Sequence, residues 1–210
     1  MKKSLLALAL IGLISSVSVA QKPRLEENVE KQRAAVAAWT TCIADENPEE
    51  VGELQYLDFR SDEYRSKLDS LSKKLVSSEC FNAMPRSYRR IRLGGLPFAG
   101  GLSERMIERD KEPLLNRLSM AAIGAEAPTY SYTDRAAMCT ARGAPHLVAV
   151  LFKTEVSSDE EATALQQIQP VLDVCTAGDN RIEASPLALR SMLASASYRL
   201  LAAQKENADA

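Results

Sequence analysis

The carboxylates of this sequence occur in pairs and short runs, and such pairs can serve as the general acid and base of a glycosidase. Most of the runs, however, follow a residue that can begin a helix, where negative charge interacts favourably with the helix dipole. A separate set of three glutamates has helical spacing and predicts a solvated helix face. The runs are Glu49-Glu50, Asp62-Glu63 and Asp159-Glu160-Glu161, and the spaced set is Glu104, Glu108 and Glu112.

The sequence gives little support for nucleophilic or metal-dependent catalysis. His146 is the only histidine, and the sequence contains no Gly-x-Ser-x-Gly motif. A catalytic triad can assemble from residues that are far apart in sequence. A single histidine directly after Pro145, near a helix start, is nevertheless expected to be a solvated side chain. We therefore assign no catalytic residue, no metal site and no cofactor.

The segment 84–101 is the most distinctive part of the chain. It contains four arginines and a tyrosine, followed by four glycines and Pro97. Arginines clustered on an otherwise acidic protein create a local positive field, which favours an anionic lipid, a phosphorylated glycan or an acidic protein as partner. The competing interpretation is a connector whose arginines pair with acidic residues elsewhere. The residues of this possible anion-binding patch are Arg86, Tyr88, Arg89, Arg90 and Arg92.

An internal repeat organises the elements that position these side chains. Cys42 aligns with Cys139, and the residues that follow match in order, including a proline, a valine and a leucine; after a two-residue deletion Cys80 aligns with Cys175. Ordered matches of this kind indicate a duplication. Four cysteines allow three pairings, and the repeat symmetry selects Cys42–Cys80 and Cys139–Cys175. A zinc site is the rival interpretation, but the sequence lacks a Cys-x-x-Cys pair.

Capping residues predict where several helices begin. Asn47-Pro48 and Ser185-Pro186 each place a capping residue before a proline at the first helical position, and residues 157–160 predict a capping box. Apolar residues between these starts recur at helical spacing. Short strands are conceivable only at Tyr88–Leu93 and Arg181–Ala184. The predicted apolar stripes include Val29, Val36, Trp39 and Ile43, as well as Leu68, Leu71 and Leu75.

The predicted fold is therefore all-α. Each copy consists of a helical hairpin, pinned at its open end by a disulfide, and a following helix. One copy alone has too few helices to bury its apolar faces, so the two copies are expected to share a core. They span about residues 25–120 and 130–205 and pack as a single domain within residues 21–210.

The framework of this repeat resembles a group of exported two-disulfide helical proteins of Gram-negative bacteria. The resemblance rests on the Cys-x5-Pro-x2-Val-x2-Leu pattern, a capped amphipathic helix that ends in cysteine, and the closing stretch Leu193–Arg199. It covers about residues 35–203, and the first copy departs from it where Ile107 replaces Tyr198. Because these motifs are structural, the resemblance implies a fold and an exported location but no activity.

Residues 1–20 have the features of a secretory signal peptide. Lys2 and Lys3 precede an apolar run from Leu5 to Ile14, and small residues lead to Ala20. The run is shorter than the roughly 20 apolar residues that span a bilayer. An even number of cysteines is also typical of chains in an oxidising compartment. We expect a periplasmic or secreted protein without a transmembrane span.

The charge balance argues against a general nucleic-acid binder. Without the two lysines of the signal, 24 basic residues face the 28 acidic ones, whereas nucleic-acid affinity depends on neutralising phosphates. The leading hypothesis is a non-enzymatic envelope interaction or scaffold protein. One alternative is a binding protein with a ligand groove between the copies, which needs an apolar cavity of several hundred Å³. The other is a hydrolase, which needs titratable residues converging in one cleft.

The signal sequence generates a direct prediction. We expect the mature protein to begin at Gln21, because cleavage after Ala20 leaves small residues at the positions that signal peptidase requires. N-terminal sequencing of protein from the envelope fraction measures this. An intact Met1 on the exported protein would contradict it.

Overall fold

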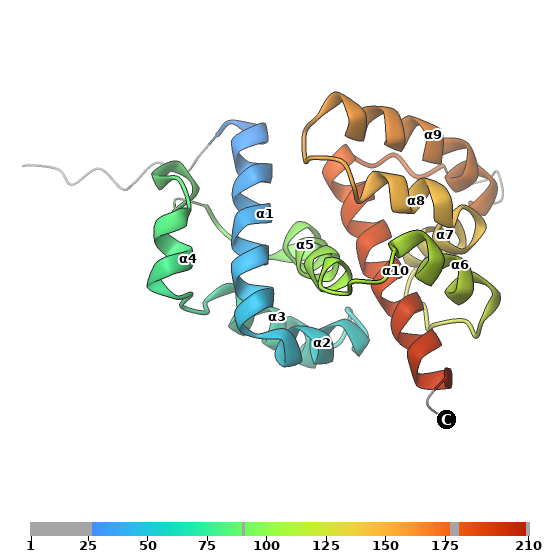
Figure 1. The fold of residues 1–210 in the computed structure, drawn as a ribbon, viewed down its shortest axis with the longest axis horizontal. Coiled ribbons are helices and arrows are strands. Elements are labelled where there is room, and N and C mark those ends of the chain that lie inside the picture. Colours follow the sequence, from blue (N-terminus) through green and yellow to red (C-terminus); the bar gives the residue numbers. More distant parts are fainter. Residues whose placement is uncertain (1–26, 90, 177–180, 209–210) are drawn as a thin grey trace, which may run out of the picture.

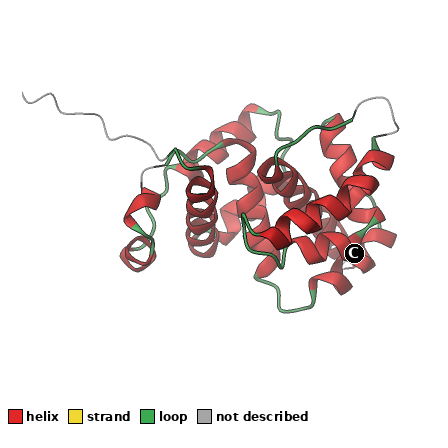
Figure 2. Cartoon of the chain, turned by 90° about the horizontal axis from the view of Figure 1, so that it is seen from above, coloured by secondary structure: helices red, strands yellow, loops and turns green. Residues whose placement is uncertain are grey.

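A computed structural model describes residues 27–89, 91–176 and 181–208, and within these ranges helices joined by loops form the fold, without a strand (Figures 1 and 2). The all-α prediction is therefore confirmed. The predicted signal peptide lies outside the described residues. The elements are α1 (Val29–Glu46), α2 (Pro48–Tyr56), α3 (Asp62–Ser72), α4 (Ser78–Ala83), a 3-10 helix η1 (Arg86–Arg89), α5 (Gly95–Glu108), α6 (Leu114–Ile123), α7 (Tyr132–Gly143), α8 (Pro145–Leu151), α9 (Asp159–Cys175) and α10 (Pro186–Ala208).

Helix α5 lies at the centre of the molecule, between α1 and α10 (Figure 1). On one side, α1, α2, α3 and α5 enclose a core built around Ile43, Leu54 and Phe98. On the other side, α6 to α10 enclose a second, larger core. Ile107, near the end of α5, belongs to this second core. Helix α5 therefore links the two helix sets through their apolar interiors.

Two glycines of α5 allow this helix to approach both neighbours closely. A Cβ atom on Gly101 would lie 2.8 Å from the side chain of Thr40 on α1, and one on Gly100 would collide with Ser191 on α10. The interpretation of segment 84–101 as a connector is wrong for these two glycines. They lie inside α5, whereas Gly94 and Gly95, both with positive φ, are its N-cap and its first residue.

The predicted helix starts at Pro48 and Pro186 are confirmed, and α8 begins at Pro145, which was predicted to lie near a helix start. The capping box lies one residue later than predicted: Glu161 N–H donates to Ser158 Oγ at 3.1 Å, and Ser157 N–H donates to Glu161 Oε2 at 3.0 Å. Asn47 does not cap α2 with its side chain. Its Nδ2 instead donates to the carbonyl oxygen of Ile43 at 3.0 Å, at the end of α1.

Helix starts in the two halves fall at the spacings of the predicted repeat. Helices α2 and α8 begin at Pro48 and Pro145, and α3 and α9 begin at Asp62 and Asp159. The duplication itself stays a prediction. The halves differ in the lengths of α3 and α9. Helix α3 ends at Ser72, and Cys80 lies on the separate helix α4, whereas α9 continues to Cys175. Cys175 therefore ends a long helix, whereas Cys80 lies on a short one.

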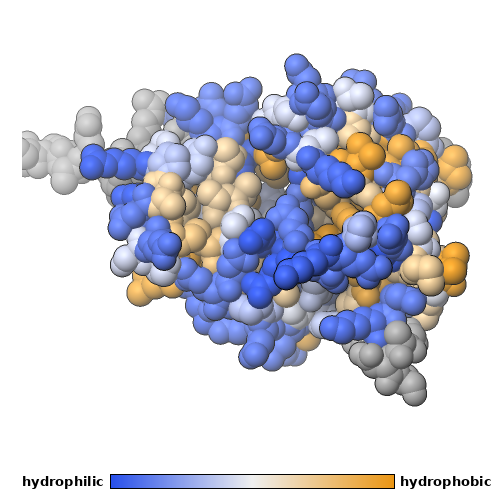
Figure 3. Space-filling model, in the orientation of Figure 1, coloured by the Kyte–Doolittle hydropathy of each residue, from blue (hydrophilic) through white to orange (hydrophobic). Residues whose placement is uncertain are grey.

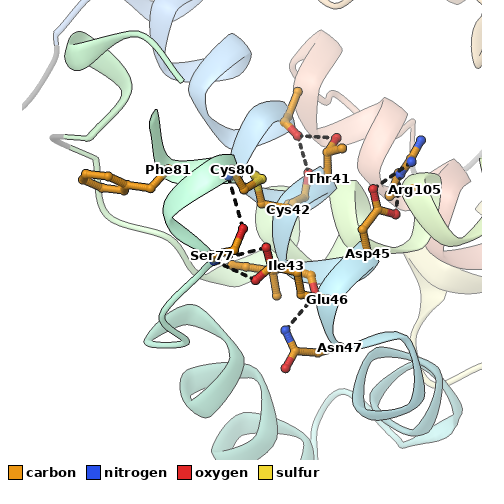
Figure 4. The surroundings of a disulfide bond; sticks show 12 residues. Thr41, Cys42, Ile43, Asp45, Glu46, Asn47, Ser77, Cys80, Phe81 and Arg105 are labelled. Atoms are coloured by element: carbon orange, nitrogen blue, oxygen red, sulfur yellow. Dashed lines mark hydrogen bonds and ion pairs between the residues drawn. A yellow bond between two sulfur atoms is a disulfide. The ribbon is translucent and has the colours of Figure 1, made fainter. Parts of the chain in front are cut away.

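Each half contains one disulfide. Cys42 is joined to Cys80 and Cys139 to Cys175, with Cα–Cα distances of 6.0 and 5.7 Å, and this is the pairing that the repeat symmetry selects. Beside the first disulfide, Ser77 caps α4 while its own N–H donates to both oxygens of Glu46 at the end of α1 (Figure 4). In the loop-entropy model, closing a loop of this length stabilises the fold by about 4 kcal/mol.

Some predicted apolar positions lie at the surface. Leu75 is 96% exposed because α3 ends before it. Val29 is 65% exposed because it is the first residue of α1. Trp39 lies at the edge of the core and donates its indole N–H to the carbonyl oxygen of Tyr88 at 2.8 Å. The conceivable strands are not formed: Arg86–Arg89 is a 3-10 helix, and the described residues 181–185 pair with no strand. Among the described helices, none combines the length and apolarity needed to cross a membrane.

Candidate functional site

The arginine segment follows α4 at the outer side of α1 (Figure 1). Arg89 is used within the fold: its Nη2 donates to the carbonyl oxygen of Phe81 at 3.0 Å, and its guanidinium lies 4.1 Å from the centre of the Phe81 ring. Tyr88 is half-buried and accepts the bond from Trp39 through its carbonyl oxygen. Arg90 lies outside the described residues. Arg86 and Arg92 are exposed.

The competing interpretation of this segment predicts ion pairs with acidic residues elsewhere. Within the part of the chain that the structure describes, no ion pair joins Arg86, Arg89 or Arg92 to a carboxylate. Among the described residues, the guanidinium of Arg89 donates hydrogen bonds to backbone carbonyls and lies over an aromatic ring. Of the predicted patch, Arg86 and Arg92 are thus the described side chains that remain available to an anion.

A pocket of about 350 Å³ lies where the two sets of helices meet. One wall comes from the end of α2, the turn after it, α3 and the start of α5. The opposite wall comes from the first turn of α7 and from α10. The lining residues are Gln55, Leu57, Phe59, Tyr64, Arg65, Leu68, Gly95, Leu96, Thr133, Asp134, Met192, Ser195 and Arg199.

Most of the pocket wall is apolar. Leu68 is buried because it lies on the inner face of α3, and Leu96 reaches the pocket from the first turn of α5. Phe59 is held in the turn between α2 and α3 by an edge-on contact with Tyr130, at a ring distance of 5.9 Å. Met192 completes this wall from α10. Such a surface binds the apolar part of a ligand through the hydrophobic effect.

A buried ion pair forms the polar end of the pocket. Arg199 on α10 donates through Nη2 to Asp134 in the first turn of α7, and both side chains are less than 10% exposed. The other oxygen of Asp134 accepts from the backbone N–H of Tyr130 at 2.8 Å. The Arg199 guanidinium also lies 5.4 Å from the centre of the Tyr130 ring. Each charge at this end therefore has a partner of opposite sign, which is what allows both to be buried, while the Nε–H of Arg199 has no hydrogen-bond partner among the described residues.

Tyr64 and Gln55 place uncharged polar groups in the pocket. Burial raises the pKa of Tyr64 to about 12, against a smaller lowering by Arg199, so the phenol stays protonated at neutral pH. Gln55 is buried, and its Nε2 donates to the carbonyl oxygen of Ala99 on α5 at 3.1 Å. This bond joins the end of α2 to the central helix. The pocket thus combines an apolar wall with a few oriented hydrogen-bonding groups.

A second cluster of charged residues is buried away from solvent. Glu161 Oε1 accepts from Arg33 on α1 at 2.7 Å and from Arg190 on α10 at 3.0 Å. Arg190 also donates through Nε to Glu104 Oε2 on α5 at 3.0 Å and through Nη2 to the carbonyl oxygen of Thr154 at 3.0 Å. The network therefore connects α1, α5, α9 and α10.

This network corrects two interpretations of the sequence. Glu104 is not on a solvated face, because its side chain is 16% exposed and faces Arg190; Glu112 lies beyond the end of α5, so the three glutamates share no helix. Glu161 is not only a first-turn carboxylate, since it is buried between two arginines. The sequence does contain a signal for the burial of Glu104 and Glu161. Their partners Arg33 and Arg190 occur among apolar and small residues, at core-facing positions of α1 and α10.

The ion pairs hold Arg190 in its charged form. Burial alone lowers the pKa of Arg190, but its hydrogen bonds with Glu104 and Glu161 raise that pKa above its ordinary value. Burial raises the pKa of Glu104, and the hydrogen bond from Arg190 only partly offsets this. Because Arg190 stays charged and donates to both carboxylates, the cluster is a structural ion network, and its carboxylates are engaged in holding helices.

Other candidate side chains remain separate. His146 is exposed at the start of α8, as expected for a solvated histidine. Glu49, Glu50, Asp62 and Glu63 lie in the first turns of α2 and α3, as predicted. Among the residues that the structure describes, His, Cys, Asp and Glu side chains form no group of three or more that could hold a metal ion.

Exposed apolar side chains gather on α6 and α8. Figure 3 shows hydrophobic residues over this region, on the right of the view, whereas hydrophilic residues cover most of the remaining visible face. Met120, Ile123 and Val150 are at least half exposed there. Single exposed apolar residues are common on folded proteins, and we assign this surface no role.

Comparisons with protein-family models, curated proteins and solved structures find no match to the chain. The resemblance to exported two-disulfide helical proteins therefore stays a prediction.

The buried network predicts a large effect of a single charge. Glu161→Gln should lower the free energy of unfolding by about 3–5 kcal/mol, because it leaves two arginines in a buried site without their shared carboxylate. The neighbouring Glu160→Gln, at an exposed position, should change it by less than about 0.5 kcal/mol. Urea unfolding of both variants measures the difference. Equal stabilities would show that Glu161 does not hold the helices together.

Proposed function

We propose that this chain is a non-enzymatic binding protein that holds a small ligand in the pocket between its two sets of helices. The observation that carries the proposal is the pocket itself, about 350 Å³ in volume, with an apolar wall and a polar end. Ligand sites typically have this size and this composition. The exported location expected from the sequence suits a ligand carrier in the bacterial envelope.

The chemistry of the pocket favours binding over catalysis. Its one lining carboxylate, Asp134, accepts a hydrogen bond at each oxygen, from Arg199 and from the N–H of Tyr130. The carboxylates of the buried network, Glu104 and Glu161, belong to a different site and bind arginines. A hydrolase needs a carboxylate that can exchange a proton with its substrate. The engaged carboxylates support a carrier instead.

The pocket predicts saturable binding of an apolar probe. N-phenyl-1-naphthylamine, which fluoresces when it leaves water, should bind with a stoichiometry of one per chain. Leu96→Trp should weaken this binding at least about tenfold, because the larger side chain fills the pocket from the first turn of α5. Fluorescence titration measures both affinities.

The matched control for this variant is Ile123→Trp. Ile123 is 81% exposed on α6 and does not line the pocket, so this variant should bind the probe like the wild type. Thermal unfolding establishes that both variants are folded. Absence of saturable binding to the wild type, or equal binding by the two tryptophan variants, would overturn the proposed carrier function.

A second candidate function rests on Arg86 and Arg92. Both are exposed and form no ion pair within the described part of the chain. Unpaired arginines on an acidic protein attract anions. We therefore propose that this segment docks the protein on an anionic lipid surface.

Loss of the two charges should weaken this docking. Arg86→Gln/Arg92→Gln should bind vesicles containing phosphatidylglycerol less well than the wild type, and wild-type binding should fall with added salt because surface charges are screened. Lys73→Gln/Arg181→Gln is the control, since it removes two exposed positive charges elsewhere. Vesicle co-sedimentation measures the difference. Equal binding by the two double variants would identify the segment as a connector.

A further inference from the structure

The charged side chains around the pocket are already neutralised. Arg199 is paired with Asp134, and Arg65 at the rim donates through Nη2 to Asp62 and through Nη1 to the carbonyl oxygen of Arg60. A carboxylate or phosphate entering this space would lose its hydration without gaining a free cation. Such burial of an uncompensated charge is costly. The electrostatics of the pocket therefore disfavour an anionic ligand.

A cationic ligand is disfavoured for a related reason. Asp134 is the only carboxylate that lines the described pocket, and its two oxygens accept from Arg199 and from the backbone N–H of Tyr130. A cation could recruit Asp134 only by breaking a buried ion pair, which leaves Arg199 uncompensated. Neither sign of charge has an unpaired counterpart in the pocket.

The hydroxyl groups of the pocket are not equivalent. Thr133 Oγ1 lies 3.1 Å from Ser131 Oγ, and Ser195 Oγ lies 3.4 Å from Ser103 Oγ. Tyr64 lines the pocket, and its hydroxyl has no hydrogen-bond partner among the described residues; at the polar end the Nε–H of Arg199 also lacks one. A polar group at a partly buried site is stabilised when a ligand supplies the missing partner.

From these contacts we infer that the ligand of this pocket is an uncharged, mostly apolar molecule with one hydrogen-bond acceptor, such as a ketone or ester oxygen, which receives the Tyr64 hydroxyl. This inference rests on the proposed carrier function, because it assigns a ligand class to the same pocket. Leu57, Leu68, Leu96 and Met192 enclose the apolar body. Burial keeps the Tyr64 phenol protonated, with a pKa of about 12, so it is a donor at neutral pH.

Three naphthalenes of similar shape test this class. 2-Acetylnaphthalene carries a neutral acceptor, 2-naphthoate carries a negative charge at neutral pH, and 2-ethylnaphthalene carries neither. Each is titrated as a competitor of N-phenyl-1-naphthylamine on the full mature protein. The ketone should bind at least about tenfold more tightly than 2-naphthoate, because the pocket has no free cation to compensate the carboxylate.

Tyr64→Phe identifies the group that recognises the acceptor. The variant should weaken binding of 2-acetylnaphthalene by about threefold to tenfold, the effect of one net hydrogen bond. It should leave 2-ethylnaphthalene unchanged, because the ring that lines the apolar wall is retained. Thr133→Val is the matched control, since it removes a pocket hydroxyl that already has Ser131 as partner, and it should not change the preference for the ketone.

The outcomes separate the two proposals. If the wild type does not bind N-phenyl-1-naphthylamine, the carrier function itself fails. If it binds the probe but 2-naphthoate competes as well as the ketone, the carrier function stands and the uncharged ligand class is wrong. Loss of ketone and ethylnaphthalene binding together in Tyr64→Phe would also overturn the assigned role of the hydroxyl.

Discussion

Burial of Glu161 between Arg33 and Arg190 constrains the whole arrangement of helices. A carboxylate in this position is tolerated only while both guanidiniums surround it, and the two arginines come from α1 and α10. Arg190 in turn holds Glu104 on α5. The position of the central helix relative to its neighbours is therefore fixed by charge as well as by packing. The pocket depends on this arrangement in part, because α5 and α10 carry residues of the network as well as residues that line the pocket.

Helix α10 carries a second buried ion pair on another face. Arg190 and Arg199 are nine residues apart, which at 3.6 residues per turn places them on opposite sides of the helix. Arg190 connects α10 to α5 and α9, and Arg199 connects it to α7 at the end of the pocket. Gly100 complements this arrangement by allowing the backbone of α5 to approach Ser191 on α10. At the junction of the two helix sets, small residues thus allow close packing and ion pairs connect α10 to its neighbours.

Local signals predicted the fold well and the site poorly. The proline-started helices at Pro48 and Pro186 follow from short stretches of sequence, and the pairing of consecutive cysteines follows from the predicted repeat. The pocket could not be found in this way, because Tyr64 and Arg199 come together only after the two helix sets have packed. Glu161 was missed for the same reason: its partner Arg33 lies 128 residues earlier. The local sequence around a glutamate that only caps a helix does not differ from that around a glutamate that also forms a buried ion pair.

The order of the disulfides has a consequence for how the chain acquires its covalent structure. Each bond joins cysteines that are consecutive in the sequence, Cys42 with Cys80 and then Cys139 with Cys175. A chain that enters an oxidising compartment with its N-terminus first presents the first pair before either cysteine of the second. Oxidation in order of arrival then produces the native bonds directly. Maturation of such a chain depends on a thiol oxidant and does not require a disulfide isomerase.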